Sequence, residues 1–167
     1  NLYAYVGNNP ATYTDPFGLY IRPRGPYTQR VIDQLRAGSA TFRQLYDALM
    51  NADASRVNIT IRPASYANRE VWRLGGPSDS QRDYRTTADG AIRFDPNSDP
   101  GNLETYLPHE IAHMAGAYFS EVKADLKGTG VNPSCENTHR NTNNPCVTPI
   151  EERINAEITQ SRAARKP

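Results

Sequence analysis

The sequence predicts an α+β fold in which a small mixed sheet packs on a central helix. Two observations carry this prediction. Apolar residues recur at helical spacing near the start and again through the last third of the chain, and short alternating segments lie between them. With 167 residues, of which 37% are hydrophobic and 22% charged, the chain suits one soluble domain with a buried core.

The first helical stretch covers residues 27–51. Its apolar positions follow three- and four-residue spacing, and Gly38-Ser39 is expected to break it into two helices. The apolar set is Val31, Leu35, Phe42, Leu45 and Leu49. Val57, Ile59 and Ile61 then alternate with polar residues, which indicates a half-buried strand.

The middle of the chain predicts a hairpin and then a long helix. A short run at 70–74 ends at a Gly-Gly-Pro turn, and residues 83–96 indicate two strands joined at Asp89-Gly90, a pair favoured in hairpin turns. Residues 103–126 are expected to be helical, and residues 128–149 to form a long polar loop. A last helix is predicted for residues 150–164, with Pro149 near its first turn.

Charge and hydropathy exclude some classes of function. The formal net charge of +1 argues against a nucleic-acid-binding surface. No apolar run approaches the roughly 20 residues that a membrane span needs, and the N-terminus does not read as a secretory signal.

The string LPHEIAHMAG contains the candidate metal-binding and catalytic residues. In a helix His109 and His113 share one face, so that their ring nitrogens can bind one zinc ion at about 2.0–2.1 Å. Zinc lowers the pKa of a bound water toward neutrality, and Glu110 is placed to take its proton as it attacks a carbonyl. Two of the three histidines of the chain lie in this motif, although a structural helix with two histidines is the alternative.

The first nineteen residues, NLYAYVGNNPATYTDPFGL, resemble the end of the core in Rhs/YD-repeat polytoxins. In that family the motif closes a β-cage and marks where the C-terminal toxin begins. The resemblance implies self-cleavage after Leu19, with Asp15 as the required aspartate and Pro16 and Gly18 in the motif. It divides the chain into residues 1–19, a linker at 20–25 and a toxin domain at 26–167.

The toxin domain resembles the minimal zincin-like domains of bacterial effector zinc metallopeptidases and polymorphic-toxin HExxH proteins. The likeness spans roughly residues 58–165, with HEIAH as its sharpest part. The metzincin histidine and the aspzincin aspartate would both fall at Phe119, so neither of those ligands is present. The third ligand must therefore come from farther along the chain.

Helix geometry selects Glu151 as the expected third ligand. Ile150, Ile154 and Ile158 define the buried face of the last helix, and Glu151 lies about 60° from its centre, whereas Glu152 lies about 160° away. Asn155 stands where a gluzincin-like helix carries a group that orients a histidine ligand. The alternative ligands are Glu152, Glu157 and Glu121, and Glu151 acting only on the helix dipole is a further alternative.

Cys135 and Cys146 lie in the polar loop and are expected to form a disulfide. The alternatives are two free thiols, or a second metal site shared with His139.

Together the motif and the resemblances predict a Zn²⁺-dependent endopeptidase toxin. The resemblance implies delivery into a target cell by a secretion system, action on a protein in the target cytoplasm, and two partners: a cognate immunity protein and the Rhs core shell of the parent chain. No nucleic acid and no membrane span are expected. Two alternatives stay open, namely a zinc amidase acting on cell-wall peptide and a non-catalytic interaction module.

Overall fold

The computed structural model describes residues 21–23, 25–53, 55–63, 78–82, 89–94, 101–136 and 145–165. These residues form an α+β fold with one four-stranded mixed sheet, which confirms the expected fold class at this level. The strands are β1 (Ile21–Pro23), β2 (Asn58–Pro63), β3 (Ser78–Arg82) and β4 (Asp89–Phe94). The helices are α2 (Pro26–Gly38), α3 (Ala40–Met50), α5 (Gly101–Ala117), α6 (Phe119–Val122), the 3₁₀ turn η1 (Pro133–Cys135) and α7 (Val147–Ala164).

The sheet has the order β1-β2-β4-β3. β2 pairs in parallel with β1 and with β4, and β3 pairs with β4 in the antiparallel sense. The predicted hairpin turn at Asp89-Gly90 is wrong, because both residues lie inside β4, where Asp89 pairs with Asn58 of β2 and Gly90 with Arg82 of β3. Burial of Ile92 and Phe94 from the same strand outweighs the local turn preference.

The short strand β1 also corrects an expectation. The sequence assigns residues 20–25 to a linker, but Ile21–Pro23 pair along β2, with Ile21 opposite Ile59. These three residues form a strand that the sequence did not predict, because the edge of β2 offers backbone groups with which they pair.

The two predicted helices at 27–51 are confirmed as α2 and α3, with the break at Ser39. Ser39 begins α3 as its N-cap, since its hydroxyl accepts a hydrogen bond from the Phe42 amide. The long helix predicted for residues 103–126 is shorter than expected: α5 ends at Ala117, and a separate turn, α6, follows Tyr118.

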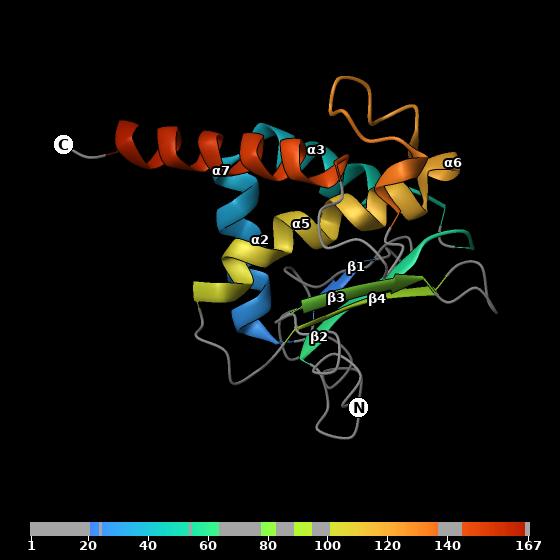
Figure 1. Ribbon diagram of the computed structural model, residues 1–167. Coiled ribbons are helices and arrows are strands. Elements are labelled where there is room, and N and C mark those ends of the chain that lie inside the picture. The colour runs from blue at the N-terminus through green and yellow to red at the C-terminus, as the bar shows by residue number, and fades with distance from the viewer. Residues whose placement is uncertain are drawn as a thin grey trace.

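Helix α5 occupies the middle of the fold, with the sheet on one side and α7 on the other (Figure 1). Its buried side chains join those of α2, α3, β2, β4 and α7 in one hydrophobic core. Ile150, Ile154 and Ile158 of α7 are all buried, as the helical phase predicts. Within the described residues, no helix is long and apolar enough to cross a membrane.

Candidate metal centre

The HEIAH motif lies in the second half of α5, the helix that contacts most of the other elements. Helical geometry brings His109 and His113 onto one face, one turn apart. His113 is 4% exposed and Glu110 is 5% exposed, whereas the His109 side chain keeps 29% of its surface accessible. The motif therefore forms a largely buried polar group that still has an opening at His109.

The two imidazole rings meet through their Nε2 atoms. These nitrogens are 2.9 Å apart, and the rings lie edge to face with their centroids 4.6 Å apart. Two nitrogens bound to one tetrahedral zinc ion at about 2.0–2.1 Å would lie about 3.3–3.4 Å apart. A small outward rotation of either ring opens the observed distance to this value.

Each ring is held at its other nitrogen by a hydrogen-bond acceptor. The Nδ1 atom of His113 lies 2.7 Å from the carbonyl oxygen of Cys135, and Nδ1 of His109 lies 2.8 Å from Oε2 of Glu151. A carbonyl and a carboxylate can only accept, so both Nδ1 atoms donate. We call the Cys135 carbonyl and the Glu151 carboxylate the two ring acceptors.

This arrangement fits a metal cation. With both Nδ1 atoms donating, each neutral ring presents a lone pair at Nε2, and the two lone pairs face each other. Such a pair repels unless a shared proton or a metal cation lies between the nitrogens. Histidines that bind metals almost always donate their other N–H to a carboxylate or a backbone carbonyl, and here one ring has each kind of partner.

The third ligand is not in place among the residues described. No group of three His, Cys, Asp or Glu side chains in that part of the chain is arranged to hold a metal ion. Glu151, the expected ligand, contacts His109 on the side of the ring away from the two facing nitrogens. Its carboxylate would have to leave Nδ1 to become a ligand, so the ligand role stays a prediction.

The alternative ligands lie as follows. Glu152 and Asn155 are exposed on α7. Glu121 accepts a hydrogen bond from Ser120, and Glu157 binds the start of α3 instead of the histidines. The cleavage-motif residues Asp15, Pro16, Gly18 and Leu19, and also His139, lie outside the described residues.

Glu157 has a structural role that explains its position. Its carboxylate accepts hydrogen bonds from the Ser39 hydroxyl at 2.6 Å, and from the Thr41 amide and hydroxyl at 2.9 and 2.7 Å. Burial raises the pKa of this carboxyl, but the hydrogen bonds from Ser39 and Thr41 outweigh that effect and hold the pKa below its ordinary value. Glu157 therefore ties α7 to the N-terminus of α3.

Two contributors to the site were missed by the sequence reasoning. The first is the Cys135 carbonyl. Every residue type supplies a backbone carbonyl, so the sequence does not indicate which one accepts from His113. The second is Gly116, where a Cβ atom would lie 2.6 Å from the carbonyl carbon of Cys135 and from the Glu136 nitrogen. A glycine three residues after His113, in HEIAHMAG, was the available signal for this close approach.

Cys135 and Cys146 are joined by a disulfide with a Cα–Cα distance of 5.1 Å, as expected. Cys135 is fully buried, and Cys146 directly precedes α7. The bond therefore links the segment that contacts His113 to the helix that carries Glu151. The second metal site considered for these cysteines is wrong, because disulfide sulfurs are not available as thiolate ligands.

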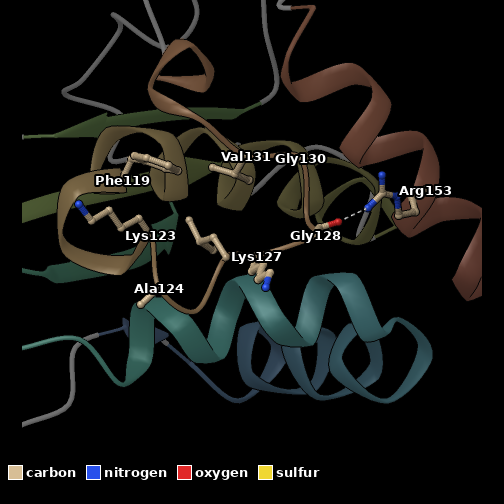
Figure 2. A pocket seen from close by; sticks show the side chains of 9 residues that line it. Phe119, Lys123, Ala124, Lys127, Gly128, Gly130, Val131 and Arg153 are labelled. Carbon is tan, nitrogen blue, oxygen red and sulfur yellow. Dashed lines mark hydrogen bonds between the residues drawn. The ribbon is translucent and has the colours of Figure 1, made fainter.

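A hollow of about 650 Å³ lies apart from the histidines (Figure 2). Figure 2 shows Lys123, Lys127 and Arg153 around it, with Arg153 donating a hydrogen bond of 3.0 Å to the Gly128 carbonyl. None of the candidate site residues lines this hollow. It is a basic surface between the loop after α6 and α7, and it is distinct from the candidate metal centre.

Comparison of the chain with protein-family models, with curated proteins and with solved structures gave no match.

Proposed function

We propose that this chain is a zinc-dependent hydrolase toxin whose minimal zincin-like domain, residues 26–167, cleaves a peptide bond. The observation that carries the proposal is the pair of facing Nε2 atoms, 2.9 Å apart, with a hydrogen-bond acceptor at each Nδ1. Metal-binding histidines almost always donate their other ring N–H to a carboxylate or a backbone carbonyl, and both histidines have such a partner here.

His109 and His113 would hold the zinc ion, and Glu151 would orient His109. When bound, zinc polarises a carbonyl oxygen and makes a water more acidic. Glu110 follows His109 directly in α5, and its carboxylate is the group that takes a proton from the attacking water and passes it to the leaving amine. Its low exposure, 5%, removes competing water and strengthens its electrostatic effect on the reacting groups.

The sheet supports a peptide as substrate. β3 is at one end of the strand order and lies against α5, the helix that carries the motif. An edge strand offers backbone N–H and C=O groups to which an extended polypeptide can add as a further strand. A peptide bound in this way would run beside the HEIAH helix.

The proposed route to the target rests on the resemblance of residues 1–19 to the end of an Rhs core. In this proposal the parent chain is cut after Leu19, the toxin is carried in the core shell, and a secretion system delivers it. A cognate immunity protein protects the producing cell. The substrate is then a protein of the target cell.

One observation favours a second candidate, a zinc amidase that acts on cell-wall peptide. Disulfides persist in oxidising compartments such as the bacterial periplasm and are rare in the cytosol. The Cys135–Cys146 bond therefore favours action outside the cytoplasm, where cell-wall peptide lies. The same two histidines and Glu110 would serve this reaction.

The test of the proposal is Glu110→Gln, with Glu104→Gln as the matched control on the same helix. Glu104 pairs with Arg162 away from the motif. Because Glu110 acts on the water and is not a ligand, Glu110→Gln should keep the fold and the zinc and lose about 10²–10⁴ in rate. Glu104→Gln should behave as wild type.

The readout is the appearance of new protein termini in cells that make each variant, measured by mass spectrometry, beside hydrolysis of purified cell-wall peptide. New termini that depend on Glu110 support the endopeptidase, and cell-wall cleavage that depends on Glu110 supports the amidase. Full toxicity of Glu110→Gln would refute both.

A further inference from the structure

The disulfide lies where it can control both histidines, and this inference rests on the proposed function. Cys135 supplies the carbonyl that accepts from His113, at 2.7 Å. Cys146 lies just before α7, five residues ahead of Glu151, whose carboxylate accepts from His109 at 2.8 Å. One covalent bond thus joins the two segments that carry the ring acceptors.

Each side of the bond is also held against α5. The backbone of Cys135 and Glu136 packs on Gly116 so closely that no Cβ atom fits between them. α7 packs on α5, and Ile150 and Ile154 of α7 are buried. Figure 1 shows α7 lying beside α5. The disulfide therefore links two segments that both pack on the helix that carries the motif.

We propose that the Cys135–Cys146 disulfide is a positioning element of the metal site, which fixes both ring acceptors and so sets the zinc affinity of His109 and His113. Without the bond, the η1 segment loses its cross-link to the start of α7, and the carbonyl that orients His113 can move. His113 can then donate from Nε2 instead of Nδ1, which removes the lone pair that a metal needs.

We expect loss of the disulfide to weaken zinc binding about as much as loss of the hydrogen-bond partner of a metal-binding histidine does. Such losses typically weaken metal affinity by about 10–100-fold. Two equivalents of a thiol reductant, which are themselves oxidised to a disulfide, supply the two electrons and two protons that convert the bond into two thiols, so a reducing compartment would weaken the site in the same way.

The test compares zinc affinity, measured by competition with a chromophoric chelator, in the full chain and in the double variant Cys135→Ser/Cys146→Ser. Serine keeps the carbonyl of residue 135 and removes only the bond. We expect the folded double variant to bind zinc about 10–100-fold more weakly than the oxidised wild type. The matched control is Glu157→Gln, which loosens α7 from α3 without contacting either histidine, and which should bind zinc as wild type does.

Each outcome is decisive. If the oxidised wild type binds no zinc, the proposed function fails. If the wild type binds zinc and the folded double variant binds it equally well, only the positioning role is overturned. Should the double variant not fold, the nitrogen NMR spectra of the metal-free wild type before and after reduction decide: a proton that moves from Nδ1 to Nε2 of His113 on reduction supports the role, and a proton that stays on Nδ1 overturns it.

Discussion

Replacing Glu151 by glutamine separates its two conceivable roles, because the substitution keeps the size and one acceptor oxygen but removes the charge. In the structure Oε2 of Glu151 lies 2.8 Å from Nδ1 of His109, and the two side chains are 25% and 29% exposed. An amide oxygen at the same place can still accept from Nδ1–H, although more weakly than a carboxylate. Glu151→Ala removes the acceptor altogether.

The magnitude follows from the orienting role. Loss of a group that orients a metal-binding histidine weakens metal affinity by about 10–100-fold, or about 1.4–2.8 kcal/mol. We place Glu151→Gln near the lower end of this range and Glu151→Ala near the upper end. Zinc affinity is measured by chelator competition on both variants, with Glu152→Gln, the exposed neighbour on α7, as the control that should not change.

Two results would refute this reasoning. If glutamine and alanine weaken binding equally, and by far more than about 100-fold, Glu151 is itself the third ligand, as helix phase alone suggested. If neither variant changes the affinity, the contact with His109 has no effect on the site.

Three further predictions concern stability and processing. Glu157→Gln should lower the free energy of unfolding by about 1–3 kcal/mol near pH 7. Since the folded-state pKa of Glu157 lies below its ordinary 4.5, the carboxylate stabilises the fold above that pH and loses this effect as the pH falls through the folded-state pKa. Urea unfolding from pH 7 to 2 should show the difference from wild type shrinking, and a constant difference would contradict it. Gly116→Ala should destabilise by about 1–3 kcal/mol, because the new Cβ meets the Cys135 backbone, although alanine normally stabilises a helix; an unchanged or raised melting temperature would show that the contact is loose. Intact-mass measurement should find the parent protein cut after Leu19 and uncut when Asp15 is replaced by alanine, and an uncut wild-type parent would count against the Rhs resemblance.

The elements that the sequence predicted well are those with a strong local pattern. The apolar spacing of α2 and α3, the alternation of β2 and the three isoleucines of α7 all report burial directly. The motif on α5 was equally visible, since two histidines four residues apart share a face wherever a helix forms.

The errors came where tertiary contacts overrode local preference. Asp89-Gly90 reads as a turn, yet β2 and β3 pair with it on both sides. β1 reads as a linker because three residues carry no periodicity, and only the edge of β2 makes them a strand.

The candidate site shows the same limit. Helix phase brought Glu151 toward the interior, but phase cannot say which atom of His109 the carboxylate meets. The carbonyl of Cys135 could not be anticipated, because its position depends on how η1 packs on Gly116, a contact between segments about twenty residues apart in the chain.

Metal analysis of the purified, oxidised chain tests the proposal most directly, with His113→Ala as the comparison. Zinc should be present at about one ion per chain in the wild type and absent from His113→Ala, because that variant removes one of the two facing nitrogens. Folding of the variant is checked by circular dichroism. A folded wild type without stoichiometric zinc, or a His113→Ala variant that keeps it, would contradict the metal site and favour a non-catalytic interaction module.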